Sequence, residues 1–233
     1  MGEIVRVDGV TKKFGGFVAL NRVSLSINEF ETTSIIGPNG AGKTTLINVI
    51  TGKLHPENGR IYLYGRDITG LPPSRRVMLG LNRTFQIINI FQNMTVYENI
   101  LISALSQGKD NARETVDNVI SRLKLSEYRD VKAFKLPHGL QRILELAIAL
   151  ATHPKILFLD EPTAGLNPAE KSSITSILED LGSNISLVIV EHDMDVVFSL
   201  SKRVIVMHKG EVIADGKPQE ISLDHRVKEV YLG

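Results

Sequence analysis

Residues 37–44 read GPNGAGKT, and residues 156–168 read ILFLDEPTAGLNP. The first stretch fits G-x-x-x-x-G-K-[ST], a pattern whose glycines let successive backbone N–H groups surround phosphate oxygens. Lys43 adds a positive charge at the β- and γ-phosphates, and Thr44 offers a hydroxyl to Mg²⁺. The second stretch supplies the acidic partner that such a loop needs. Together the two stretches predict that the chain binds ATP with Mg²⁺.

The sequence around this loop has the context that phosphate binding requires. Residues 32–36 read TTSII, a strand-forming run, and a helix is expected from Gly42 to about Thr51. The positive N-terminal end of that helix would point at the nucleotide. A chance glycine-rich turn is the alternative, but the second motif makes it a poor explanation. The expected nucleotide contacts are Gly37, Pro38, Asn39, Gly40, Ala41, Gly42, Lys43, Thr44 and Thr45.

The second stretch begins as a strand and ends in two acids. Residues 156–159 are all apolar, as expected of a parallel strand that is buried on both faces. Asp160 then emerges at the carboxyl end of the strand, where doubly wound sheets bind their ligands. We expect Asp160 to hold Mg²⁺ directly or indirectly, and Glu161 to polarise the water that attacks the γ-phosphorus. The alternative, that the two acids merely begin a solvated loop, fits poorly with the upstream phosphate-binding loop.

Composition excludes several other classes of protein. The 233 residues are enough for one large domain, and 27 basic against 26 acidic residues leave no basic face for nucleic acid or an anionic membrane. The absence of cysteine excludes disulfides and thiolate metal sites. The N-terminus lacks an apolar signal-peptide core, and no run approaches about 18 apolar residues. We therefore expect a cytoplasmic chain that binds no nucleic acid and contacts a membrane only through partners.

Hydrophobic periodicity divides the chain into strand-rich and helix-rich parts. Between Met94 and about Leu136 the apolar residues recur at helical spacing, which indicates a helical subdomain. The expected strands span residues 3–10, 18–27, 32–36, 59–64, 81–85, 156–159, 186–190, 204–207 and 211–214. The other expected helices span residues 42–51, 73–79, about 140–151, 168–181, a segment after residue 193, and 223–232.

Five landmarks occur in an order that resembles the nucleotide-binding domain of ATP-binding-cassette (ABC) proteins over essentially the whole chain. They are the loop at residues 37–45, Gln86 where the family has its Q-loop, a signature-like segment at 136–142, the DEPT strand end at 160–163, and His192 after the strand at 186–190. The stretches GLNRTFQIINIFQNMTVYENI, AGLNP and EVYLG further resemble the ATPases of branched-chain amino-acid importers.

The resemblance implies an α/β fold with a P-loop NTPase core, that is, a mostly parallel sheet with flanking helices. An N-terminal antiparallel β subdomain and an inserted helical subdomain would complete it. The chain would be a single ABC ATPase domain over residues 1–233. Residues 1–86 and 153–233 would form the core with the antiparallel subdomain, and residues 87–152 would form the helical subdomain.

The resemblance also implies further site residues. Gln86 would offer its amide oxygen to Mg²⁺ or to the attacking water, and would report loss of the γ-phosphate to the helical subdomain. His192 would reach the γ-phosphate with an imidazole N–H. Phe14 lies where the family places an aromatic ring on adenine, although such residues are as often packing residues. The expected catalytic set is Glu161, His192 and Gln86, and the expected Mg²⁺ set is Thr44, Gln86 and Asp160.

The signature segment departs from the family's LSGGQ, because residues 136–140 read LPHGL. Pro137 replaces the serine, His138 a glycine and Leu140 the glutamine, and proline brings neither a hydroxyl nor a backbone N–H. Gly139 keeps its place, so its backbone N–H and the N-terminal end of the following helix remain for the γ-phosphate of ATP held by a second protomer. One hypothesis is that a different ATPase subunit with its own signature completes this chain's ATP site. The other is that the divergent segment works through backbone contacts.

The function implied by the resemblance is ATP hydrolysis that drives a membrane transporter. The chain would form a homodimer, or a heterodimer with a second ABC ATPase, and act on transmembrane permease subunits at the inner face of the cell membrane. Uptake of branched-chain or other hydrophobic amino acids is the expected use. Two alternatives stay open: the ATPase of another ABC system, such as lipid or lipopolysaccharide export, and a slow or non-hydrolysing ATP-sensing cassette. A guanine-nucleotide switch is disfavoured, because no N/T-K-x-D motif follows the loop.

Overall fold

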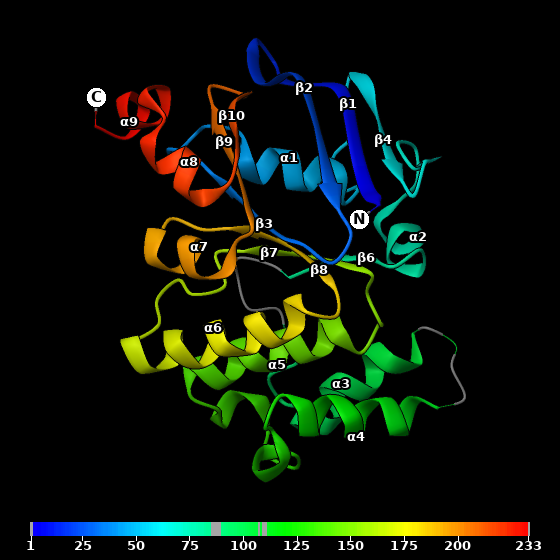
Figure 1. The fold of residues 1–233 in the computed structure, drawn as a ribbon. Helices are drawn as coiled ribbons and strands as arrows, with labels where there is room; N and C mark the ends of the chain where they lie inside the picture. The colour runs from blue at the N-terminus through cyan, green and yellow to red at the C-terminus, as the bar shows by residue number, and fades with distance from the viewer. Residues whose placement is uncertain (1, 85–89, 107, 109–110, 233) are drawn as a thin grey trace.

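The computed structural model describes residues 2–84, 90–106, 108 and 111–232, and it contains two β-sheets with helices packed around them (Figure 1). One sheet is antiparallel, in the order β2-β1-β4-β5. The other has the order β10-β9-β3-β8-β7-β6 and is parallel except for the antiparallel pair β9 and β10. The α/β fold expected from the sequence is therefore confirmed.

The strands have the following bounds: β1 (Glu3–Phe14), β2 (Phe17–Asn28), β3 (Thr32–Ile36), β4 (Asn58–Leu63), β5 (Arg66–Asp67), β6 (Leu81–Arg83), β7 (Ile156–Asp160), β8 (Ser186–Val190), β9 (Arg203–His208) and β10 (Glu211–Gly216). The helices are α1 (Lys43–Ile50), α2 (Pro73–Met78), α3 (Val96–Leu105), α4 (Ala112–Arg122), α5 (His138–Leu150), α6 (Pro168–Gly182), α7 (Met194–Leu200), α8 (Pro218–Leu223) and α9 (His225–Leu232). Two short 3-10 turns, η1 (Ser126–Tyr128) and η2 (Ala133–Lys135), precede α5.

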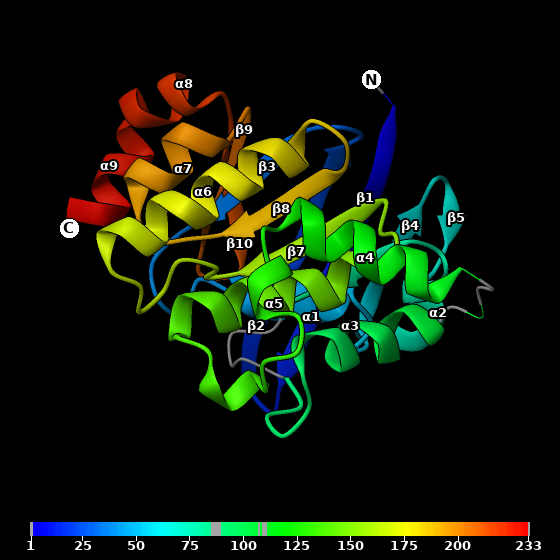
Figure 2. The same cartoon turned by 90° about the horizontal axis from the view of Figure 1, so that it is seen from below.

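The parallel sheet separates two hydrophobic clusters, because side chains alternate between its faces. On β7, Ile156 and Phe158 join a cluster with α1 and the antiparallel sheet, whereas Leu157 and Leu159 join a cluster with α3, α4, α5 and α6. Figure 1 shows α1 between the two sheets, and Figure 2 shows α5 and α6 on the other side of β7 and β8. The central strands β3, β7 and β8 are buried along their whole length.

Polar side chains fix the ends of several helices and join the two sheets. Thr95 and Glu98 form a capping box at the start of α3, and Asn167 and Glu170 form another at the start of α6.

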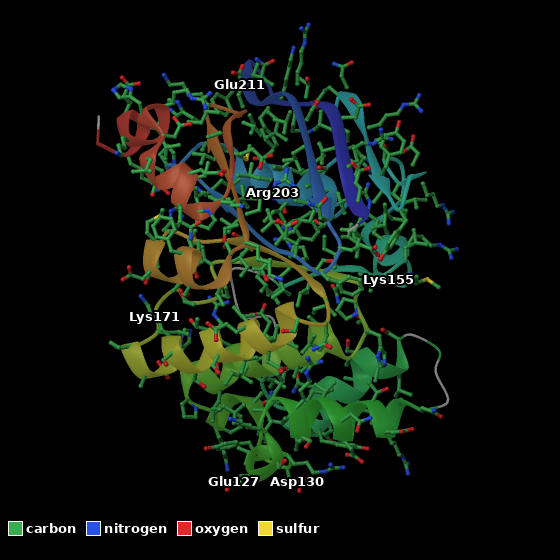
Figure 3. The ribbon with its side chains drawn as sticks, in the orientation of Figure 1. Glu127, Asp130, Lys155, Lys171, Arg203 and Glu211 are labelled. Carbon is green, nitrogen blue, oxygen red and sulfur yellow. The ribbon has the colours of Figure 1, made fainter. Side chains whose placement is uncertain are left out.

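Arg203 of β9 (Figure 3) donates to both carboxylate oxygens of Asp215 at 2.7 and 2.6 Å, and to the backbone oxygen of Ser26 on β2 at 3.1 Å. This guanidinium therefore links the edge of the parallel sheet to the antiparallel one.

Most sequence-based elements agree with the structure to within a few residues, and β5 and α8 are among the elements that were not expected. The expected helix over 223–232 is present as α9 (His225–Leu232), whereas α8, which precedes it and ends at Leu223, was not expected. Pro218 starts α8 at its first turn, and the Asp224 carboxylate accepts the backbone N–H of Arg226 at 2.8 Å, which begins a new helix. The expected strand at 81–85 is shorter in the structure, where β6 ends at Arg83. Residue 85 lies outside the described residues.

We propose that residues 87–152 constitute the helical subdomain and that the remaining residues form the core. The proposal is supported by the packing of α3, α4 and α5, whose buried residues share one cluster. The same cluster continues onto β7 and β8, so the subdomain would share its hydrophobic core with the parallel sheet.

Candidate nucleotide-binding site

A cavity of about 320 Å³ lies at the carboxyl edge of the parallel sheet, at the N-terminus of α1. It brings together residues from the β1–β2 hairpin, the loop before α1, and the ends of β7 and β8. Its lining residues are Phe14, Phe17, Ala19, Asn39, Gly40, Ala41, Gly42, Lys43, Thr44, Thr45, Glu161 and His192. Most of the site residues expected from the sequence therefore lie around one cavity.

The loop before α1 contains two glycines at which a Cβ atom would clash with the backbone of another strand. Gly42 is the N-cap of α1 with φ 103°, and a Cβ there would lie 2.6 Å from the backbone oxygen of Ala19. A Cβ at Gly37 would lie 2.1 Å from the backbone oxygen of Met207. No side chain caps α1, so its first N–H groups remain available to an anion.

Lys43 is held inside the loop. Its Nζ donates to the backbone oxygens of Gly37 at 2.6 Å and Pro38 at 3.1 Å, and the residue is only 6% exposed. Burial lowers the pKa of Lys43, while the nearby Glu161 and Asp160 carboxylates act in the opposite direction. Gly37 and Pro38 thus contact the ammonium group and do not themselves line the cavity.

Asp160 carries a buried carboxylate oxygen that is suited to a cation. The residue is 2% exposed, and Oδ2 has no hydrogen-bond partner among the described residues. The guanidinium of Arg83 approaches Oδ2 with Nη2 at 3.8 Å, which is longer than a hydrogen bond. Burial raises the pKa of Asp160, and Arg83 partly offsets that effect.

The donor set fits Mg²⁺ better than a fully protein-bound metal. No cluster of three or more His, Cys, Asp or Glu side chains suitable for a metal occurs in the part of the chain that the structure describes. Mg²⁺ commonly uses one or two protein oxygens together with phosphates and water. The Asp160 carboxylate and the hydroxyl of Thr44, an exposed residue at the start of α1, are consistent with that arrangement.

Glu161 and His192 lie side by side at the ends of adjacent strands. His192 Nε2 is 3.0 Å from Glu161 Oε1, although 31 residues separate them in the sequence. The backbone N–H of Glu161 donates to the Val190 oxygen of β8 at 2.9 Å. Glu161 adopts φ 50°, a conformation that is uncommon for residues other than glycine and is found at functional sites.

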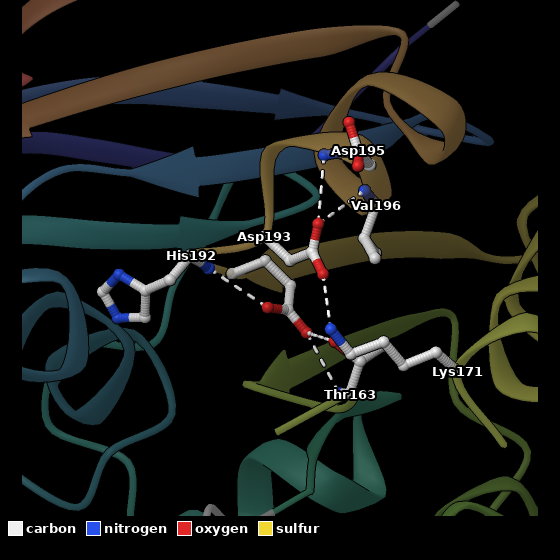
Figure 4. A network of polar contacts seen from close by, with 7 residues as sticks. Thr163, Lys171, His192, Asp193, Asp195 and Val196 are labelled. Carbon is white, nitrogen blue, oxygen red and sulfur yellow. Dashed lines mark hydrogen bonds and ion pairs between the residues drawn. The ribbon is translucent and has the colours of Figure 1, made fainter. Parts of the chain in front are cut away.

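Glu191, which the sequence did not single out, joins the loop after β7 to the loop after β8, because it bonds both Thr163 and His192, which are labelled in Figure 4. It is 4% exposed. Its Oε1 accepts from the Thr163 backbone N–H at 3.0 Å and from the Thr163 hydroxyl at 2.6 Å. Its Oε2 accepts from the His192 backbone N–H at 3.1 Å. Glu191 therefore positions both the DEPT turn and His192, and its place between Val190 and His192 was the only sign of this in the sequence.

The aromatic residues form the outer wall of the cavity. Phe14 is 48% exposed and Phe17 is 63% exposed, so neither ring is buried as a core residue would be. Both line the cavity from the tip of the β1–β2 hairpin. Phe17 was missed in the sequence, where the run FGGF at residues 14–17 could have indicated a pair of exposed rings.

The remaining expected residues lie elsewhere. Gln86 lies outside the described residues. None of Pro137, His138, Gly139 and Leu140 is among the described residues that line the cavity. Pro137 is the N-cap of α5, and the Gly139 N–H donates to Glu170 Oε1 of α6 at 3.2 Å. A Cβ at position 139 would lie 2.7 Å from that oxygen, so glycine is needed for the contact.

Comparison with known proteins identifies the class. Residues 20–164 match the family model described as ABC transporter, and residues 211–233 match one described as branched-chain amino acid ATP-binding cassette transporter. The chain belongs to the ABC transporter ATP-binding family. It is an ATPase subunit of an ABC transporter, most like those of branched-chain amino-acid importers.

Two relatives match along almost their whole length. The high-affinity branched-chain amino acid transport ATP-binding protein BraF of Pseudomonas aeruginosa is 38% identical, covering 99% of this chain and 98% of its own. The probable branched-chain amino acid transport ATP-binding protein LivG of Methanocaldococcus jannaschii is 38% identical with the same coverage.

Solved structures agree with the fold and with nucleotide binding. A nucleotide-free ATP-binding cassette from an ABC transporter superimposes with a TM-score of 0.91 at 37% identity over 100% of both chains. A dimeric cassette in a post-hydrolysis state with ADP and phosphate has a TM-score of 0.81 at 27% identity, covering 92% of this chain and 99% of that one. No helix in the described part of this chain is long and apolar enough to cross a membrane.

Proposed function

We propose that this ATPase drives uptake of branched-chain or other hydrophobic amino acids through membrane permease subunits. The observation that carries the proposal is whole-length similarity to proteins named for branched-chain amino acid transport, together with the C-terminal match at residues 211–233. The importer relatives support this use over lipid or lipopolysaccharide export. We place the chain at the inner face of the membrane, held there by its partners.

The residues around the cavity suit an attack of water on the γ-phosphate of ATP. The free N–H groups at the start of α1 and the Lys43 ammonium would bind the phosphates. Thr44 and Asp160 would hold Mg²⁺, with Gln86 as the third expected ligand, and the bound ion would neutralise charge on the β- and γ-phosphates. Glu161 would accept a hydrogen bond from the attacking water, and His192, which contacts Glu161, would be within reach of the same phosphate.

The identity of the dimer partner affects hydrolysis, because the signature segment lacks the family's serine, one glycine and the glutamine. Gly139 is the only one of the two family glycines that the segment keeps, and its N–H is bonded to Glu170. A γ-phosphate from a second protomer would therefore have to displace this carboxylate. This supports the hypothesis that a different ATPase subunit with its own signature completes this chain's site. If so, a 1:1 mixture of the two subunits hydrolyses ATP faster than this chain alone, and equal rates would contradict it.

Transport and hydrolysis are tested together with the assembled transporter. We would reconstitute the chain with its co-purified membrane subunits in vesicles and follow accumulation of labelled leucine, with lysine as the control solute. We expect ATP-dependent accumulation of leucine only. In the Glu161→Gln variant we expect ATP binding without turnover or accumulation. ATP hydrolysis without amino-acid accumulation would refute the proposed use, and a purified chain with no Mg·ATP binding would refute the proposed site.

A further inference from the structure

Four side chains of alternating charge lie between the end of β7 and the first turns of α5. They are Asp160, Arg83, Glu145 and Arg142, and their side chains are 3, 10, 7 and 8% exposed. Arg83 Nη2 lies 3.8 Å from Asp160 Oδ2, and Arg142 Nη1 lies 3.2 Å from Glu145 Oε2. Burial lowers the pKa of Arg83, while the Asp160 and Glu145 carboxylates both act to raise it, and Arg83 and Glu145 line the same groove. We call these four residues the charge chain.

Arg83 also contacts the helix that follows the phosphate-binding loop. Its Nη1 donates to Asn48 Oδ1 and, at 3.5 Å, to Thr51 Oγ1, both on or next to α1. Its Nε donates to the Thr84 backbone oxygen at 3.2 Å. One guanidinium thus contacts α1, approaches Asp160 at the end of β7, and lines the same groove as Glu145 of α5. Arginine suits this junction because its planar fork can bond several partners at once and stays charged when buried.

A cation bound to Asp160 would change the interaction between Asp160 and Arg83. Asp160 Oδ2 makes no hydrogen bond within the described residues, and Arg83 stops short of bonding distance. A divalent ion on this oxygen would both occupy the carboxylate and repel the guanidinium. The acid at the other side of Arg83 is Glu145, and interactions in a buried site are screened far less than at the surface.

The space around Glu145 allows a small movement. Arg83 and Glu145 both line a groove of about 370 Å³ between β6, α3 and α5. A second cavity of about 20 Å³ lies beside Glu145 and Arg142, next to α6. The far end of the charge chain is therefore not tightly enclosed. Arg142 is the last residue of the signature-like segment at 136–142.

We propose that Arg83 and Glu145 are positioning residues that couple occupation of Asp160 by Mg²⁺ to the first turns of α5, and so to the signature segment. The proposal rests on the proposed function, because it takes Asp160 as a Mg²⁺ ligand. It adds a path within one protomer from its own ATP site to the surface that meets the second ATP. In this arrangement each site of the dimer would sense whether the other is loaded.

The test measures the start of α5 in the full-length chain. We would use Glu161→Gln protein, at concentrations where light scattering shows monomer, and follow hydrogen exchange in peptides within residues 138–145 with ATP alone and with ATP and Mg²⁺. ATP affinity with and without Mg²⁺ is measured in parallel with a fluorescent ATP analogue. We expect Mg²⁺ to change exchange at the start of α5 by about fivefold or more, the lower range of known couplings.

The deciding variant adds Glu145→Gln, which keeps the size of the side chain and one acceptor oxygen but removes the charge. We expect the Mg²⁺ effect on exchange to disappear while the Mg²⁺ effect on ATP affinity stays within about twofold, since Glu145 is not part of the ATP site. Glu31→Gln is the matched control, because Glu31 is also a buried acid, 8% exposed, with a neutral partner in Asn28. It should keep the Mg²⁺ effect.

Arginine variants test the centre of the charge chain. Arg83→Lys keeps the charge and should keep part of the effect, whereas Arg83→Gln should lose it. Arg76→Lys is the control for a buried guanidinium, because Arg76 is 0% exposed and bonds only backbone oxygens in the described structure. If the arginine variants do not fold, the Glu145 comparison decides.

The outcomes separate the two proposals. A Mg²⁺ effect on exchange that survives Glu145→Gln, or that is absent from the Glu161→Gln protein, would overturn the coupling and leave ATP binding untouched. If Mg²⁺ has no effect on ATP affinity in the Glu161→Gln protein, the proposed ATP site itself is wrong, and the coupling falls with it.

Discussion

Replacing Glu191 by glutamine tests how strongly the site is held by one buried carboxylate. The two oxygens of Glu191 accept three hydrogen bonds, from the Thr163 N–H, the Thr163 hydroxyl and the His192 N–H. A glutamine offers one oxygen and one NH₂ group, so one backbone N–H must face a donor. Losing a bond to a charged group costs about 1.5–3 kcal/mol, and leaving a buried N–H unsatisfied costs about 1–3 kcal/mol. These two costs partly describe the same loss, so they are not simply added. We expect Glu191→Gln to lower the free energy of unfolding by about 2–4 kcal/mol.

Urea unfolding of the nucleotide-free chain measures this loss. The free energy of unfolding of a typical protein is about 5–15 kcal/mol. A loss of the expected size leaves the variant folded, so its turnover can also be measured. We expect kcat to fall about tenfold, because His192 loses the bond that fixes its backbone beside Glu161. Thr163→Val removes only the hydroxyl, and a double-mutant cycle with Glu191→Gln should give a coupling of about 1 kcal/mol. An unfolding free energy within about 0.5 kcal/mol of the parent would refute the reasoning.

Three further predictions concern separate parts of the chain. Asp193→Ala removes the N-cap of α7 and the 2.6 Å contact with Lys171, and should cost about 1–2 kcal/mol in urea unfolding. Lys171 holds the pKa of Asp193 below its usual value, so this stabilisation is present above about pH 4 and is lost as the pH falls through the lower folded pKa. Phe14→Ala and Phe17→Ala should each weaken ATP binding by about 3–10-fold in fluorescence titrations without affecting inorganic triphosphate; unchanged ATP affinity would make both rings structural. Gly139→Ala should lower the unfolding free energy by about 1 kcal/mol by displacing Glu170, and no loss would show that the 3.2 Å bond contributes little.

Much of the fold was predictable because local patterns determine it. Uninterrupted apolar runs marked the strands that are buried on both faces, such as residues 156–159 and 186–190. Helix α8 was not predicted, because its six residues are too few to show a helical repeat of apolar side chains. A side chain that caps its own neighbour, as Asp224 does for Arg226, is a local contact that periodicity alone does not reveal.

The candidate site was predictable only where a motif specifies it. The phosphate-binding loop and the acids after β7 have fixed spacing, so their positions followed from the sequence. Glu191 and Arg83 have no such motif. Glu191 contacts Thr163 across 28 positions, and Arg83 approaches Asp160 across strands that are far apart in the sequence. Contacts of that kind depend on strand order, and the register between β6, β7 and β8 supplies it.

The same burial that positions the site also makes the empty site unfavourable. Burial raises the pKa of Asp160 and lowers that of Lys43. The ionised form of each group is therefore less stable in the folded chain than in the unfolded one. For Asp160, stability is therefore greatest at low pH and is lost as the pH rises through its folded pKa; for Lys43 it is recovered as the pH rises through its folded pKa. Where each group is ionised, its charge opposes folding. Phosphate would compensate Lys43 and a divalent cation would compensate Asp160, so Mg·ATP should stabilise this chain more than either part alone, because each part relieves only one of the two buried charges.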